Sequence, residues 1–181
     1  MSQYVNSQNE LLLVKLMEYY KKDNNLQKML TIINGESQIS LRIVDWFSTN
    51  YAKKNYTVYS LQNGNRFKVY NDYKLKLKAY SKKRFDPFCR WQRITIPYGE
   101  EGLFIETTIG QLNFFKWALE NEVIDYIKSH YKQIELDMNT RNSNSKKRDE
   151  VTINRKKREE LSVSAIKTIK KEDVEIVVKF N

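Results

Sequence analysis

The spacing of apolar residues along the first forty positions predicts two helices. Apolar side chains recur there at steps of three and four, as one face of an amphipathic helix requires. The two groups are Leu12, Leu16, Tyr19 and Tyr20, and then Leu26, Met29, Leu30 and Ile33. The pair Asn34-Gly35 is expected to end the second helix, because glycine suits the left-handed residue that follows a helix.

A third helix is expected after this break, with Ser37 as its N-cap. Its apolar face would hold Leu41, Val44, Phe47 and Tyr51, with Trp46 at the edge. The period then changes to that of strands. The β-prone runs are residues 57–61, 66–70, 90–96 and 103–107. Turn-forming residues 62–65 and 97–102 join them into two hairpins.

Helical spacing returns between the hairpins and after them. A helix carrying Tyr70, Tyr73, Leu77 and Tyr80 is expected to end at Asp86-Pro87, because the residue before proline avoids the helical region. Thr108 and Gln111 are spaced as a capping box, which predicts a helix start. The two helices that follow would carry Leu112, Phe115, Trp117 and Leu119, and then Val123, Ile124, Ile127 and Tyr131, ending before Asp137.

The chain therefore predicts an α+β fold, with helices packed on a small, mainly antiparallel sheet and a basic excursion near the C-terminus. Residues 1–138 would form the body. Residues 139–145 have no apolar period, so 139–160 is interpreted as a basic polar linker or loop. Residues 161–181 would return to the body through a strand at 174–180.

Charge narrows the choice of partner. The chain has 181 residues, a formal net charge of +10 from 32 Lys and Arg against 22 Asp and Glu, and a pI near 9.5. This balance favours an acidic partner. The single Cys89 and single His130 exclude an intramolecular disulfide and a His/Cys zinc site made by one chain. No apolar run approaches a membrane span, so we expect an intracellular, soluble protein without a membrane partner.

Two regions combine the residue types that contact nucleic acid. Residues 74–93 hold eight basic residues and one acidic residue, together with four aromatic residues, whereas residues 141–158 hold eight basic and two acidic residues without aromatics. The first region could contact bases, and the second would anchor phosphates. The candidate binding residues are Lys82, Lys83, Arg84, Arg90, Trp91, Arg93, Lys146, Lys147, Arg148, Arg155, Lys156, Lys157 and Arg158.

Simpler interpretations stay open. Charge runs are often solvated surface, and residues 146–158 could equally be a nuclear localisation signal. The aromatic residues Phe85, Phe88 and Trp91 suit a core better than a stacking surface, because large aromatics are usually buried. For Cys89, an inert buried thiol is favoured over a nucleophile.

Enzymatic function finds little support. The acidic residues Glu100, Glu101 and Glu106, with Lys116 nearby in sequence, have residue types that a metal-dependent nuclease uses. Their spacing does not group them, and no phosphate-binding glycine loop is present. We expect no enzymatic activity and no cofactor.

Three stretches carry a resemblance to a known family: residues 41–47 with Asn50-Tyr51, residues 85–90, and residues 107–118. Together with residues 158–162 and the strand ending at Phe180, they resemble a small uncharacterised protein family of nucleocytoplasmic large DNA viruses, the giant viruses. Some members carry a transcription-factor label. The resemblance covers about residues 41–180 and brings no catalytic or binding motif.

The resemblance implies a viral protein in the host cytoplasm, at the viral factory, or in the virion, with the nucleus as an alternative. Combined with the charge pattern, it predicts a non-enzymatic nucleic-acid-binding protein, with DNA as the preferred partner, acting in transcription or genome packaging. The alternative is a virion structural or interaction protein whose basic surface binds acidic viral proteins.

Overall fold

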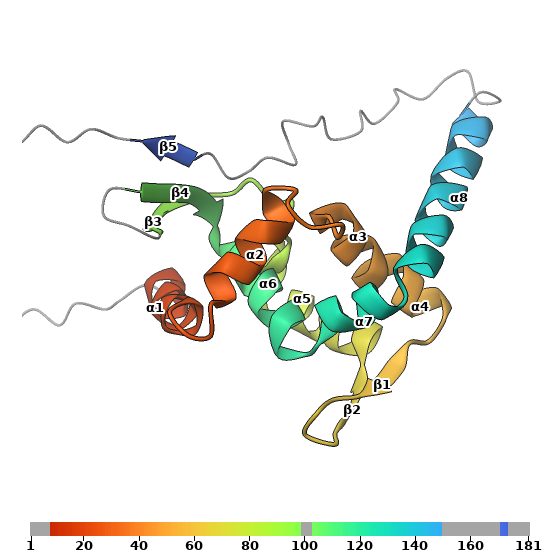
Figure 1. Cartoon of the computed structure of the whole chain (residues 1–181), viewed down its shortest axis with the longest axis horizontal. Helices are drawn as coiled ribbons and strands as arrows, with labels where there is room; N and C mark the ends of the chain where they lie inside the picture. The colour runs from red at the N-terminus through yellow and green to blue at the C-terminus, as the bar shows by residue number, and fades with distance from the viewer. Residues whose placement is uncertain (1–7, 99–102, 150–170, 174–181) are drawn as a thin grey trace, which may run out of the picture.

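The computed structural model describes residues 8–98, 103–149 and 171–173, with side chains described through Arg141. The elements in chain order are α1 (Gln8–Tyr20), α2 (Asn25–Ile33), α3 (Leu41–Trp46), the π-helical turn η1 (Phe47–Tyr51), α4 (Ala52–Lys54), β1 (Val58–Ser60), β2 (Arg66–Lys68), α5 (Val69–Phe85), β3 (Arg93–Pro97), β4 (Leu103–Thr108), α6 (Ile109–Glu120), α7 (Val123–Ser129), α8 (Tyr131–Asp149) and β5 (Lys171–Asp173) (Figure 1).

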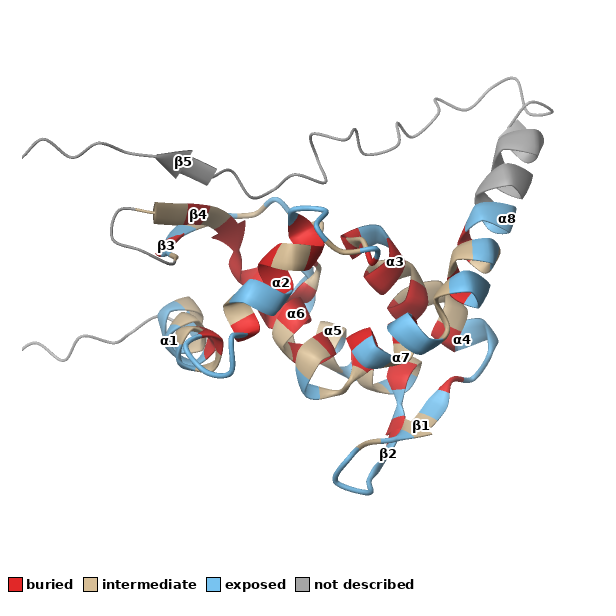
Figure 2. Ribbon diagram, in the orientation of Figure 1, coloured by how far each residue is buried: buried red, intermediate tan, exposed pale blue. Residues whose placement is uncertain are grey.

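The α+β class is confirmed, with the helices gathered around α6 and the strands at the margins. Helices α1, α2, α5 and α7 all contact α6. The sheet β3-β4-β5 lies at one end of the molecule and the hairpin β1-β2 projects from another side (Figure 1). Both sheets are antiparallel. Buried positions concentrate on the central helices (Figure 2).

Helix α6 is buried over most of its length because most of its side chains are apolar, and the Lys116–Glu120 ion pair marks its more exposed side. Residues 109–115 are all buried, and so are Trp117 and Ala118. The expected helix start is confirmed, since the Thr108 hydroxyl accepts a hydrogen bond from the Gln111 amide at 3.1 Å. The Gln111 side chain accepts a second bond from the Thr107 hydroxyl at 2.8 Å. These bonds satisfy polar groups that burial would otherwise leave unpaired.

Three long-range hydrogen bonds connect α6 to its neighbours. The Tyr20 hydroxyl donates to the Leu112 carbonyl at 2.6 Å, which joins α1 to α6. The Asn113 amide donates to the Arg84 carbonyl at 2.9 Å, and the Trp117 indole donates to Asp72 Oδ1 at 2.6 Å, which joins both ends of α5 to α6. Removing any of these donors would leave a poorly hydrated acceptor inside the protein.

Both predicted hairpins are confirmed, with β1, β2 and β3 shorter than predicted and β4 one residue longer. In the first hairpin Val58 pairs with Lys68, and β2 ends there because Val69 begins α5. In the second, β3 begins at Arg93, three residues later than predicted, because Gln92 has a positive φ of 41° that interrupts extended backbone. The strand β5 pairs with β4 and returns the chain to the sheet. The predicted strand at 174–180 lies outside the described residues.

The predicted N-cap of the third helix is wrong. Ser40, not Ser37, caps α3, and its hydroxyl accepts from the Ile43 amide at 3.3 Å. The Ser37 hydroxyl accepts from the Ile39 amide, so it closes the turn before the helix. The two serines are three residues apart, and their sequence neighbourhoods did not separate these roles.

The prediction of a loop at 139–145 is also wrong, because α8 continues to Asp149. Among its described side chains, α8 packs on the body at its base, through buried Ile134 and Met138. Asp137 holds that base, since it accepts from the Trp46 indole at 3.1 Å and pairs with Lys54 at 2.8 Å. Beyond it the helix stands away from the body (Figure 1), so it needs no apolar face and shows no apolar period. Residues 150–160 of the predicted linker lie outside the described part of the chain.

Gly110 is required where α6 crosses the end of α5. A Cβ atom at this position would lie 2.8 Å from the Asp86 carbonyl oxygen and 3.2 Å from that of Lys83. Both are backbone atoms, so neither can rotate away. The backbones approach so closely that any side chain here would force α5 and α6 apart.

Replacing Gly110 by Ala is therefore expected to destabilise the protein by about 2 kcal/mol or more, as overpacking of a core does. Urea unfolding followed by circular dichroism measures this. Gly64→Ala is the control, because its Cβ meets nothing within 4 Å and only its φ of +81° opposes the change. A smaller loss for Gly110→Ala than for Gly64→Ala would contradict the close crossing.

Asp45 introduces a pH-dependent contribution to stability. Burial raises the pKa of its carboxyl from 3.8 to about 7, and the charge of Asp86 adds to the rise. In the unfolded chain this group ionises near pH 4. Between these values the folded protein holds a proton that the unfolded chain has lost, so the contribution of Asp45 to stability falls as pH rises from about 4 to about 7.

Asp45→Asn should remove this dependence. The variant is expected to gain stability relative to the natural protein between pH 4 and pH 8, by at most about 4 kcal/mol at about 1.4 kcal/mol per pKa unit. Thermal melts across that range measure the difference. Asp125→Asn, at an exposed position paired with Lys128, controls for loss of a carboxylate. Parallel pH profiles for natural protein and Asp45→Asn would refute the assignment.

Candidate nucleic-acid interface

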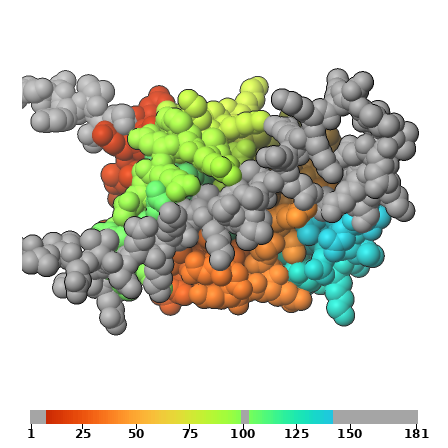
Figure 3. All heavy atoms as spheres, turned by 90° about the horizontal axis from the view of Figure 1, so that it is seen from above, coloured from red at the N-terminus to blue at the C-terminus, as the bar shows by residue number. Residues whose placement is uncertain are grey.

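The predicted site residues fall into three groups. Those at 82–93 lie at the end of α5, in the turn that follows, and at the start of β3. Lys146, Lys147 and Arg148 lie near the end of α8, and residues 155–158 lie outside the described residues. Lys83 lies beside the start of α6, whereas α8 stands at the end of the molecule away from β3 and β4 (Figure 1 and Figure 3). The structure therefore does not bring the first two groups together.

A sharp backbone break sets the direction of residues 82–85. Ser81 has φ 65° and ψ 166°, inside what is otherwise one helix. This region of backbone space is almost restricted to glycine. Lys82 and Lys83, which follow directly, are exposed. The acidic residue of the segment, Asp86, accepts a hydrogen bond from the Phe88 amide at 2.9 Å and so caps the turn.

The aromatic residues of this segment divide between core and surface. Phe85 is fully buried among Tyr73, Phe114 and Trp117, which confirms a core role. Trp91 is only half-buried. The Lys83 ammonium lies 4.9 Å from the centre of the Trp91 ring, a cation–π contact.

Two of the predicted arginines already have partners in the fold. Arg84 donates to Asn9 Oδ1 at 2.7 Å and to Gln8 Oε1 at 3.0 Å, which attaches α1 to the end of α5. Arg93 pairs with Glu106 at 2.9 Å across the β3-β4 ladder. The exposed candidate cations of this segment without a carboxylate partner among the described residues are therefore Lys82, Lys83 and Arg90, and Lys83 contacts the Trp91 ring. Lys74 and Lys78 extend the positive charge along α5.

The residues considered for catalysis are dispersed. Glu106 pairs with Arg93 and Lys116 pairs with Glu120 at 3.0 Å, while residues 100–101 are outside the described chain. His130 stacks on Tyr126 with ring centres 4.1 Å apart, at the end of α7. Within residues 8–98 and 103–141, no three His, Cys, Asp or Glu side chains form a group able to hold a metal ion.

None of the helices in the described part of the chain has the length and hydropathy of a membrane-spanning segment.

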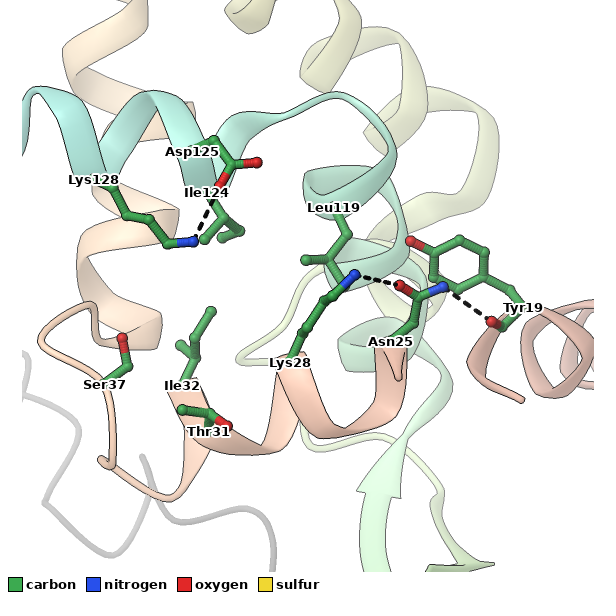
Figure 4. A pocket seen from close by; sticks show the side chains of 10 residues that line it. All are labelled: Tyr19, Asn25, Lys28, Thr31, Ile32, Ser37, Leu119, Ile124, Asp125 and Lys128. Atoms are coloured by element: carbon green, nitrogen blue, oxygen red, sulfur yellow. Dashed lines mark hydrogen bonds and ion pairs between the residues drawn. The ribbon is translucent and has the colours of Figure 1, made fainter. Parts of the chain in front are cut away.

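A groove of about 410 Å³ lies between α2 and the α6-α7 corner (Figure 4). Ile32, Leu119 and Ile124 form its apolar wall. Its two lysines are engaged, since Lys128 pairs with Asp125 at 3.0 Å and Lys28 donates to Asn25 at 3.5 Å. This groove therefore offers less positive charge to an anion than the segment at 82–91.

Sequence reasoning missed one group of residues, around Tyr56. Tyr56 is 86 % exposed and lines a second hollow with Lys53 and Lys68. The run Lys53-Lys54-Asn55-Tyr56 carries a signal of basic and aromatic residues together. The same basic residues also stabilise the C-terminus of a helix, and α4 does end at Lys54, so the run by itself does not indicate a binding site.

Ser81→Gly tests the backbone break before the lysines. Glycine adopts φ near +65° without strain, so the variant should be more stable by about 1 kcal/mol, with Lys82 and Lys83 unmoved. Chemical unfolding measures the gain. Ser60→Gly, in strand β1, is the control and should lose stability. A loss of stability in Ser81→Gly would show that the break is absent in solution.

Comparisons with known proteins identify relatives but no activity. A family model described as a family of unknown function, DUF7197, matches residues 2–181. The uncharacterized protein L507 of Acanthamoeba polyphaga mimivirus is 50% identical over 117 residues, which is 61% of this chain and 45% of that protein. The chain therefore spans less than half the length of this relative. No solved structure matches. This similarity supports the resemblance to a giant-virus family, and the family match over residues 2–181 shows that the chain belongs to the DUF7197 family.

Proposed function

We propose that this protein binds nucleic acid without catalysing a reaction, with DNA as its preferred partner, in viral transcription or genome packaging. One observation carries the proposal: Lys82, Lys83 and Arg90 are exposed, and the Lys83 ammonium lies 4.9 Å from the centre of the half-buried Trp91 ring. Within the described chain, no carboxylate lies within 4.0 Å of these three cations. Other cations, such as Lys54 and Arg93, do have carboxylate partners.

Unpaired cations of this kind favour phosphate. A lysine without a carboxylate partner can neutralise a phosphate and release its counterions without first breaking an ion pair. Trp91 adds a flat apolar surface beside them, on which a sugar or an unpaired base can stack. The segment thus combines phosphate contact with a surface for bases.

Helix α8 supplies the second part of the proposed interface. Its base is fixed by Asp137, which contacts Trp46 and Lys54. At about 1.5 Å per residue, the ten residues from Met138 to Arg148 extend about 15 Å beyond that base. A basic cluster at that distance would contact phosphates away from the Trp91 surface and lengthen the footprint on DNA.

Salt dependence tests the proposal. If about six phosphates are contacted, the logarithm of the binding constant should fall against the logarithm of salt with a slope near −5 for duplex DNA. The triple variant Lys82→Gln, Lys83→Gln, Arg90→Gln should reduce this slope to about −2.5, and the triple variant Lys146→Gln, Lys147→Gln, Arg148→Gln should act similarly. Fluorescence anisotropy with labelled duplex DNA at several salt concentrations measures both.

The control removes the same charge elsewhere. Lys21→Gln, Lys22→Gln, Lys128→Gln changes three exposed lysines outside the proposed interface and should leave the slope within about one unit of the natural protein. Equal loss in all three triple variants would mean that only net charge matters, and the proposal would fail. Competition by an acidic protein as effective as competition by DNA would instead favour the interaction-protein alternative.

A further inference from the structure

A second hollow, of about 280 Å³, lies where α4 ends beside β2 and the start of α5. Its walls are Ala52, Lys53, Tyr56, Thr57, Lys68, Tyr70 and Asn71. The lining residues thus include two lysines, two tyrosines and one asparagine, and none of them is acidic. The volume is at the lower end of small-ligand pockets, which run to roughly 300–1,000 Å³, so a single ring system fits better than a larger ligand.

Tyr56, which lines this hollow, has an unfavourable backbone conformation and a highly exposed side chain. Its φ of 48° is left-handed, and the bond from the Thr57 amide to the Ala52 carbonyl at 3.1 Å places it where a helix usually ends in glycine. A bulky residue there costs about 1 kcal/mol or more. Tyr56 as a whole is 86 % exposed, so packing of its side chain offsets little of that cost.

The cations of the hollow are available for an anion. The Lys53 ammonium lies 5.6 Å from the centre of the Tyr70 ring. Lys53 and Lys68 are exposed and have no carboxylate within 4.0 Å among the described residues. Their neighbour Lys54 differs, because it pairs with Asp137 at 2.8 Å.

We propose that this hollow binds one nucleotide of a single-stranded nucleic acid. In this proposal the base stacks on the Tyr56 ring, Lys53 and Lys68 contact the phosphates, and the amide of Asn71, which also lines the hollow, hydrogen-bonds the edge of the base. A duplex keeps its bases stacked inside, so only an unpaired nucleotide can occupy the site. The inference rests on the proposed function and adds a base-contacting site outside residues 82–93.

The experiment compares a ten-residue oligothymidylate with a ten-residue abasic strand of equal charge, both labelled for anisotropy. Tyr56→Gly removes the ring and also relieves the left-handed strain, so it should fold at least as well as the natural protein. It should bind the oligothymidylate about 5- to 150-fold more weakly, the range for loss of one stacked base. Its affinity for the abasic strand should not change. Tyr56→Trp should retain binding to the oligothymidylate.

Other outcomes separate this inference from the proposed function. Equal affinity of natural protein and Tyr56→Gly for the oligothymidylate overturns the nucleotide site, whatever duplex DNA does. Absence of binding to either strand by the natural protein overturns it as well. Absence of salt-dependent duplex binding overturns the proposed function, whereas a Tyr56-dependent preference for oligothymidylate over the abasic strand would still support the nucleotide site.

Discussion

Helix α6 is buried over most of its length, and a helix with so many buried apolar side chains is stable in water only when other elements pack around it. The rest of the structure follows from that requirement, since α1, α2, α5 and α7 all pack on α6. Burial also demands that each polar group on the helix find a partner. Thr108 caps its start, Asn113 and Trp117 bind α5, and Tyr20 reaches it from α1. The stretches that resemble a giant-virus family largely form this centre, so the resemblance reflects core packing more directly than binding.

The basic side chains fall into two groups: those that make hydrogen bonds or ion pairs within the fold, and those that are exposed without a carboxylate partner among the described residues. Arg84 attaches α1 to α5, Arg93 crosses the β3-β4 ladder, and Lys54 holds Asp137 at the base of α8. Each of these side chains is needed by the structure itself. The exposed cations near Trp91 and Tyr56 have no such role in the described chain, and in both places an aromatic ring lies beside them. Both proposals rest on this division between structural and unassigned positive charge.

Much of the fold could be predicted because its signals are local. The Thr108 cap, the Asn34-Gly35 stop, the break at Asp86-Pro87 and both hairpins depend on residues within a few positions of one another. The errors arose where local signals were ambiguous or absent. Ser37 and Ser40 are both acceptable caps, and only the path of the turn selects Ser40. Helix α8 has no apolar period beyond its base, because most of it does not face the body.

The candidate sites, like the fold, were predictable from the sequence only in part. The sequence by itself determined that the chain is basic, that positive charge concentrates at 74–93 and 141–158, and that the fold is α+β. Only the tertiary structure decided that Arg84 and Arg93 have partners in the fold, and that Tyr56 stands exposed beside Lys53 and Lys68. The physical reason is that residue type and periodicity are properties of neighbouring positions. Pairing and exposure instead depend on contacts between residues far apart in the chain.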